Sequence, residues 1–155
     1  MPPWWGTARV SLDQGGGAAE LLAFTQEWAE AWGAALNESA EYRAAAATWE
    51  GPVALLLDDG VPEARRAVVL DLWHGACRSA RTADPDGLET SGFVFQASSA
   101  GWKAVLSGNT SPAMALLSGK IRLGRGNLAA LLPYAAAAKQ LLDLASQVPT
   151  RFLEG

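Results

Sequence analysis

The chain has 155 residues, of which half are apolar and only 18% are charged, and its net charge is −4. This length fits a single domain with a substantial hydrophobic core. The twelve cationic residues are scattered, which argues against a nucleic-acid-binding protein, because such proteins need a concentrated basic surface. No apolar run approaches the roughly 20 residues that span a bilayer, so we expect no stable membrane insertion.

The single cysteine and the single histidine, Cys77 and His74, leave little room for metal or nucleophilic chemistry. They cannot supply a four-ligand zinc set, so we expect no metal and no cofactor. A Cys–His nucleophile would also need a third group to orient the base, and none is indicated, so we predict no catalytic residue and no enzyme activity. A lone cysteine forms no internal disulfide, and the N-terminus lacks a secretory signal pattern, which together indicate a cytoplasmic protein.

Residues 1–17 are expected to form a flexible leader that ends in three glycines, and residues 18–150 are expected to form the domain. The leader contains Trp4 and Trp5. We expect these indoles to dock on the domain or on a partner, because exposing both would forgo substantial hydrophobic burial.

The first part of the domain has the pattern of two helices. Apolar residues recur at intervals of three and four from Ala18 to Leu36, which predicts an amphipathic helix. Ser39 is the expected N-cap of a second, short helix, which carries Tyr42 inward and stops at Gly51-Pro52. Because neither helix shows a pairing of catalytic side chains, their predicted role is packing.

Three strands are predicted next, over residues 53–57, 67–73 and 76–83. The first is a continuous apolar run, which is typical of a central strand buried on both faces. The short links between these strands indicate antiparallel pairing. A turn over residues 84–87 then leads to the next strand.

The following stretch alternates between strand and helix patterns. Residues 93–98 and 120–123 alternate in polarity, which predicts two strands. Between them, two short helices are expected to end at Gly108 and Gly119, since glycine accepts a positive φ at the end of a helix.

A long C-terminal helix is predicted over residues 128–148, with Asn127 as a candidate N-cap and Pro133 as a point where the helix restarts or kinks. Together, these elements predict an α+β fold. We expect a largely antiparallel sheet of about five strands, covered by an N-terminal pair of helices, the short helices and the long C-terminal helix.

Several short motifs occur in a distinctive order along the chain. They are Asn37, Tyr42, Trp49-Glu50-Gly51, Asp71-Leu72, Trp102, Ser107-Gly108, Pro112, Ala115, Gly119-Lys120-Ile121-Arg122-Leu123, Gly124 and Gly126. This order resembles the sterol carrier protein 2 (SCP2) lipid-binding superfamily, and it is most similar to the bacterial small-domain branch. The resemblance covers roughly residues 20–148.

The resemblance implies an apolar tunnel between sheet and helices that holds a lipid, such as a sterol, a fatty acid or a fatty acyl-CoA, without transforming it. The residues that it would place along the tunnel are Phe93, Phe95, Trp102, Val105, Met114, Leu117, Leu128, Leu131, Leu132 and Tyr134. A stripe of this kind is also typical of an ordinary core. The alternative is therefore an assembly module with the same fold and a filled core, which acts through self-association as a homodimer or through a protein partner.

A cationic loop follows the strand that begins at Lys120. Gly124 to Ala129 match the G-x-G-x-x-A pattern of dinucleotide-binding loops, but no second parallel strand follows the helix, so we interpret the match as coincidental. Arg122, Arg125 and Gly126 are instead the candidate residues for holding an anionic head group, beside the N–H groups of a helix N-terminus. The simpler interpretation is a glycine turn with solvated cations.

Overall fold

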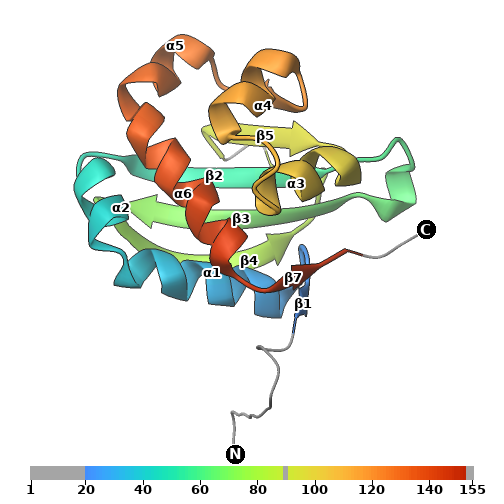
Figure 1. Ribbon diagram of the computed structural model, residues 1–155, viewed down its shortest axis with the longest axis horizontal. Coiled ribbons are helices and arrows are strands. Elements are labelled where there is room, and N and C mark those ends of the chain that lie inside the picture. The colour runs from blue at the N-terminus through green and yellow to red at the C-terminus, as the bar shows by residue number, and fades with distance from the viewer. Residues whose placement is uncertain (1–19, 89–90, 153–155) are drawn as a thin grey trace, which may run out of the picture.

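A five-stranded mixed sheet forms the centre of the molecule, with its strands in the order β4-β3-β2-β5-β6 (Figure 1). The strands are β2 (Glu50–Leu57), β3 (Arg66–Trp73), β4 (Ala76–Ala83), β5 (Phe93–Ala97) and β6 (Ile121–Arg125). β2 pairs antiparallel with β3 and parallel with β5, and the two outer pairs are antiparallel. This computed structural model describes residues 20–88 and 91–152, so the predicted leader lies outside the described residues.

The helices gather on one face and along one edge of the sheet (Figure 1). They are α1 (Gln26–Glu38), α2 (Ala40–Ala45), α3 (Ser99–Leu106), α4 (Pro112–Ser118), α5 (Leu128–Leu131) and α6 (Ala135–Gln147), with the 3₁₀ turns η1 (Pro62–Ala64) and η2 (Leu132–Tyr134). The predicted α+β architecture, with an N-terminal helical pair and a long C-terminal helix, is confirmed. Among the helices of the described ranges, none is long and apolar enough to cross a membrane.

The N-terminal helices differ from the prediction at their ends. α1 begins only at Gln26, because the preceding β1 (Leu21–Leu22) pairs with β7 (Thr150–Arg151). Ser39 caps α2 as predicted, and its hydroxyl accepts a hydrogen bond from the Tyr42 N–H at 3.0 Å. However, the prediction that Gly51-Pro52 stops this helix is wrong, since α2 ends at Ala45 and both residues belong to β2.

The C-terminal helix is interrupted near its start. Asn127 is the N-cap, since its side-chain oxygen accepts a hydrogen bond from the Ala130 N–H at 2.7 Å. The α-helix then stops at Leu131, and η2 carries Pro133 before α6 begins at Ala135. Proline has no N–H and clashes with the preceding turn, which accounts for the break.

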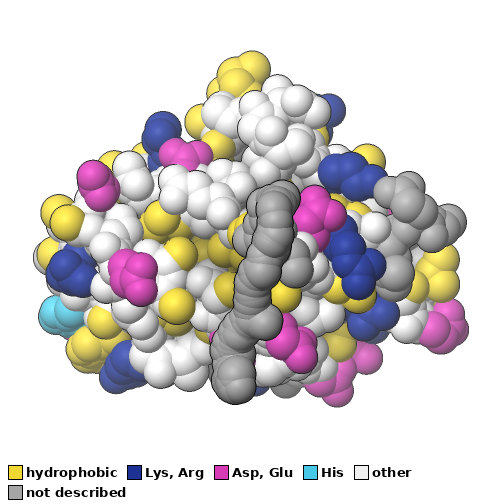
Figure 2. All heavy atoms as spheres, turned by 60° about the horizontal axis from the view of Figure 1, so that its bottom comes forward, with side chains coloured by type: hydrophobic (Ala, Val, Ile, Leu, Met, Phe, Trp, Pro, Cys, Tyr) yellow, Lys and Arg dark blue, Asp and Glu magenta, His cyan; other side chains and the backbone are white. Residues whose placement is uncertain are grey.

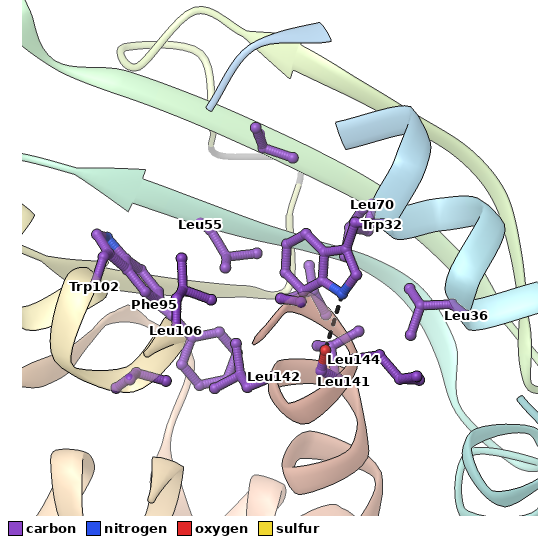
Figure 3. Close-up of a cluster of buried hydrophobic side chains, with 14 of the residues drawn as sticks. Trp32, Leu36, Leu55, Leu70, Phe95, Trp102, Leu106, Leu141, Leu142 and Leu144 are labelled. Atoms are coloured by element: carbon purple, nitrogen blue, oxygen red, sulfur yellow. Dashed lines mark hydrogen bonds between the residues drawn. The ribbon is translucent and has the colours of Figure 1, made fainter. Parts of the chain in front are cut away.

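Three fully buried tryptophans bind the helices to the sheet and to each other. Trp28 and Trp32 of α1 and Trp102 of α3 are each 0% exposed. The Trp32 indole N–H donates to the Leu141 carbonyl at 2.9 Å (Figure 3), and the Trp102 N–H donates to the Leu56 carbonyl at the same distance. Each buried indole therefore contributes a large apolar area without leaving a polar group unsatisfied.

The opposite face of the sheet carries a second, smaller core. Alternate residues of β2, β3 and β5 point to it, and Leu88 covers them from the loop after β4. This cluster consists of Ala54, Leu56, Ala67, Val69, Leu88 and Val94. β2 is thus buried on both faces, as its continuous apolar sequence predicts.

The β4 edge of the sheet is covered by α1. The Asn37 side-chain amide donates to the Cys77 carbonyl at 2.9 Å and accepts from the Cys77 N–H at 2.8 Å. At the other end of α1, the Gln26 side-chain amide likewise donates to the Ala80 carbonyl and accepts from the Thr82 N–H. The two amides take the place of a neighbouring strand, so α1 satisfies backbone groups that an edge strand would leave open.

Replacing Asn37 with Ala should remove both bonds to Cys77 and lower the free energy of unfolding by about 1–2 kcal/mol. Urea denaturation of the two proteins measures the difference. Glu38→Ala is the matched control, because Glu38 is a neighbouring exposed residue of the same helix. Equal stability of Asn37→Ala and Glu38→Ala would show that the amide pair contributes nothing.

Candidate ligand-binding site

A small apolar cavity lies between the sheet and the helices that cover it. The sheet side is formed by residues of β2, β3 and β5, and the helix side by residues of α2, α5, η2 and α6. The lining residues are Tyr42, Ala46, Trp49, Val53, Leu72, Phe95, Leu131, Tyr134, Ala137, Ala138 and Leu141. With hydrocarbon and aromatic side chains on both sides, this site suits an apolar ligand.

The cavity exists because α6 presents small side chains to the sheet. Ala137 and Ala138 face the space that Phe95 and Val53 leave above the strands. Leu141 follows one turn later and fills its position with a larger side chain. The alanine-rich start of α6 therefore keeps the helix from filling this part of the core.

Aromatic rings close the cavity at the start of β2. The Trp49 and Tyr134 rings meet edge to face with centroids 4.8 Å apart, and the Phe93 ring lies 5.3 Å from Trp49. The Tyr134 hydroxyl also hydrogen-bonds the Thr48 side chain at 3.0 Å. Because Tyr134 belongs to η2, this contact holds the interrupted part of the C-terminal helix against α2 and β2.

The cavity is nearly filled in this conformation. Its volume is about 20 Å³, which admits about one water molecule. Ligand sites for drug-sized molecules usually have roughly 300–1,000 Å³. Binding of a lipid would therefore require the covering segment around η2 to move away from the sheet.

The predicted tunnel residues occupy three kinds of position. Phe95, Leu131 and Tyr134 line the cavity, whereas Trp102 and Val105 are buried elsewhere in the core and Phe93 is partly buried on Trp49. Met114, Leu117 and Leu132 are 56%, 79% and 63% exposed and point away from the cavity. The side chain of Leu128 lies outside the described residues.

Several lining residues were not among those predicted. Tyr42, Ala46 and Trp49 come from the second helix and its extension, which were assigned to packing. Their inward spacing was visible in the sequence, but only the tertiary contact of α2 with α6 places them opposite Ala138.

The candidate head-group residues do not share one site. Arg122 lines an open polar groove of about 430 Å³, together with Lys120, Gln96 and Asp58. Arg125 and Gly126 are not part of its lining. α5 has only four residues, so its helix dipole is too short to contribute the attraction that the sequence suggested.

Gly126 has a steric role. It adopts a φ of +93°, and a Cβ atom there would lie 2.6 Å from the Phe93 ring. A larger residue would have to displace one of the aromatic rings that border the cavity.

Cys77, His74 and Asp71 do not converge. The Cys77 thiol is buried and donates to the Ser79 carbonyl at 3.3 Å. His74 is exposed on a tight turn and contacts Glu50 at 2.5 Å, while Asp71 pairs with Arg78 at 3.1 Å. In the described part of the chain, no three His, Cys, Asp or Glu side chains form a group that could hold a metal ion.

Burial, with a smaller contribution from the charge of Asp71, raises the pKa of the Cys77 thiol to about 11. The folded chain therefore holds this proton more tightly than the unfolded chain, whose thiol titrates near its ordinary pKa of about 8.5. The free energy of unfolding should fall by about 1–2 kcal/mol as pH rises from about 9 to 11.

Denaturation at several pH values measures this fall. Burial also raises the pKa of Tyr42, so the contribution of Cys77 is the difference between the wild type and Cys77→Ala. An identical pH dependence of the two proteins would contradict the assignment to the thiol.

The fold and sequence match known proteins over most of the chain. The family model of the SCP-2 sterol transfer family matches residues 31–139. A crystal structure of sterol carrier protein 2 is 45% identical, with a TM-score of 0.75, over 81% of this chain and 98% of that chain. No curated protein shows a significant match.

Two further structures extend the comparison. A conserved hypothetical protein from Thermus thermophilus, described as a possible sterol carrier protein, is 43% identical with a TM-score of 0.74, over 87% of this chain and 95% of that chain. A sterol carrier protein domain of Helicoverpa armigera is 17% identical with a TM-score of 0.52, over 89% and 99% of the two chains, which shows the shared fold alone. With its family model matched over most of the domain and two relatives above 40% identity, this chain belongs to the SCP-2 sterol transfer family.

Proposed function

We propose that the protein binds a lipid, or another long apolar molecule, and releases it unchanged. The observation that carries this proposal is the cavity between the sheet and the covering helices, which is lined by apolar and aromatic side chains. Family membership supports it, since the related structures are named sterol carrier proteins. Binding would draw its free energy from apolar area removed from water, about 25 cal/mol per Å².

The interrupted C-terminal helix offers a way to open the cavity. α5 and η2 are short segments separated by Pro133, and each contributes side chains, Leu131 and Tyr134, to the cavity wall. The hydroxyl of Tyr134 is held to Thr48 by exposed hydrogen bonds, which are weak because water competes for both groups. A ligand could displace this short segment while α6 stays packed on α1 and α2.

The ligand classes that fit are a fatty acid, a fatty acyl-CoA or a sterol-like molecule. All three have a long apolar part that the cavity could accept after opening. Lys120 and Arg122 line a separate open groove that shares no residue with the cavity, and neither cation forms an ion pair with another described residue. The buried, lone thiol is compatible with a cytoplasmic location.

A second candidate function is a protein-assembly module, and the filled interior favours it. Trp28, Trp32 and Trp102 are fully buried in the core, and the remaining cavity admits about one water molecule. In that case the protein would act through a homodimer or a protein partner, without a small ligand.

Titration with a fluorescent fatty acid distinguishes the two functions. We expect saturable binding at one site per chain, with the ligand recovered unchanged, because the described residues bring no catalytic set together. Native mass spectrometry before and after delipidation measures the stoichiometry and any ligand retained from cells. Failure of fatty acids, acyl-CoA and sterols to bind would favour the assembly module.

Replacing Ala138 with Leu should fill the cavity and weaken fatty-acid binding by tenfold or more, while the protein remains folded. Ala138 lines the cavity, whereas Ala136, two residues earlier on α6, is exposed. Ala136→Leu therefore makes the same chemical change outside the cavity and should leave the affinity unchanged. Equal affinities of the two variants would place the ligand somewhere other than this cavity.

A further inference from the structure

One buried hydroxyl in the cavity lining has no hydrogen-bond partner. Tyr42 of α2 lines the cavity and is 1% exposed. Its backbone N–H is bound by Ser39, but within residues 20–88 and 91–152 no hydrogen bond involves its phenol oxygen. Such a group is rare in a folded protein, because a hydroxyl that leaves water without gaining a partner destabilises the fold.

The buried indoles of the domain, in contrast, are all supplied with acceptors. Trp28, Trp32 and Trp102 each donate an indole N–H to a protein oxygen at 2.9 Å. Trp49, on the cavity wall, donates to a backbone carbonyl at the same distance. The packing therefore satisfies these four aromatic donors and leaves the Tyr42 hydroxyl as an exception.

The cavity lining offers a ligand little else to bind by polar contact. It contains no charged side chain, and its other two polar side-chain groups, the Trp49 indole N–H and the Tyr134 hydroxyl, are already bonded within the protein. Charged side chains lie at the surface instead, as Figure 2 shows for the face that it brings forward, where acidic and basic groups are spread over the molecule. A ligand in the cavity therefore meets one free neutral group and no charge that could balance its own.

The phenol of Tyr42 is a fixed and neutral donor. Burial, with a smaller contribution from Cys77, raises the pKa of Tyr42 above its ordinary value, so the proton stays on the oxygen. The Cys77 thiol is itself occupied, since it donates to the Ser79 carbonyl at 3.3 Å. The backbone is held as well, because Ser39 caps α2 through the Tyr42 N–H at 3.0 Å.

We propose that Tyr42 selects a ligand with a neutral oxygen, either a hydroxyl or a carbonyl, at the end that enters the cavity, and hydrogen-bonds that oxygen in the bound state. A phenol hydroxyl both donates and accepts, so either group fits. A carboxylate or phosphate beside it would be buried without a cation, which costs far more than burying a neutral oxygen. An acidic lipid would instead enter tail first and keep its head outside. This inference rests on the proposed function and names the substrate class of the same cavity.

A ligand oxygen suits this position better than a trapped water molecule. The closed cavity of about 20 Å³ has room for about one water, and buried waters usually make about three hydrogen bonds. Among the described side chains of the lining, only the Tyr42 hydroxyl is left to bind it. A carbonyl oxygen on an apolar chain needs only one donor, and its chain is matched by the apolar walls.

Replacing Tyr42 with Phe removes the hydroxyl and keeps the ring. The probes are 1-dodecanol, 2-dodecanone, dodecane and dodecanoate, delivered from cyclodextrin and measured by displacement of a fluorescent fatty acid. We expect Tyr42→Phe to bind the alcohol and the ketone about tenfold more weakly than the wild type, because their buried oxygen loses its partner. Dodecane should bind the variant at least as tightly as the wild type, and dodecanoate should be unaffected.

The ligand-free protein gives a second, independent measurement. After delipidation, Tyr42→Phe should melt about 2–4 °C above the wild type, since it no longer buries an unpaired hydroxyl. Tyr134→Phe is the matched control, because it makes the same chemical change at a hydroxyl that is already bonded to Thr48. It should not raise the melting temperature, and it should change the affinities of all four probes by one common factor.

Four results would overturn the proposal. They are unchanged affinities of Tyr42→Phe for all probes, an equal loss for dodecane and 1-dodecanol, an equal loss for dodecanoate and 1-dodecanol, and a lower melting temperature of ligand-free Tyr42→Phe, which would show that the hydroxyl already has a partner such as water. Each of them leaves the proposed function standing as long as the wild type binds the fluorescent fatty acid. If the wild type binds none of these molecules, the proposed function fails and this inference fails with it.

Discussion

The structure depends on burying indoles whose N–H groups all find acceptors. Trp32 joins α1 to the Leu141 carbonyl of α6, and Trp102 joins α3 to the Leu56 carbonyl of β2. The first bond links α1 to α6, the first and last helices of the domain, and the second fixes α3 on the sheet. The alanines at the start of α6 can then leave a gap over Phe95, because the indoles already hold that helix in place.

The sequence predicts most elements because their signals are local. Ser39 and Asn127 cap the helices for which they were proposed, and the apolar run of β2 is buried on both faces. The errors come from long-range contacts. Leu21–Leu22 forms a strand only because Thr150–Arg151 lies beside it, and Gly51-Pro52 joins β2 because β3 pairs with it.

The site is less predictable than the fold for the same reason. Met114 and Leu117 have the spacing of a core-facing helix surface, yet both side chains are exposed, since Pro112 and Ala115 supply the packing of α4. Leu132, in η2, is exposed as well. The cavity depends on the meeting of α2 with α6, which no local pattern encodes. Composition shows that apolar side chains are plentiful, but only tertiary packing decides which of them remain exposed to solvent.

The amides of Asn37 and Gln26 leave the sheet with two unlike edges. At β4, the backbone groups that they bind cannot accept another strand unless α1 first detaches. At β6, the outer edge carries Arg122 and Arg125, whose charges oppose a second copy of the same edge. Fibril-like growth through the sheet is therefore blocked by a helix on one side and by electrostatic repulsion on the other.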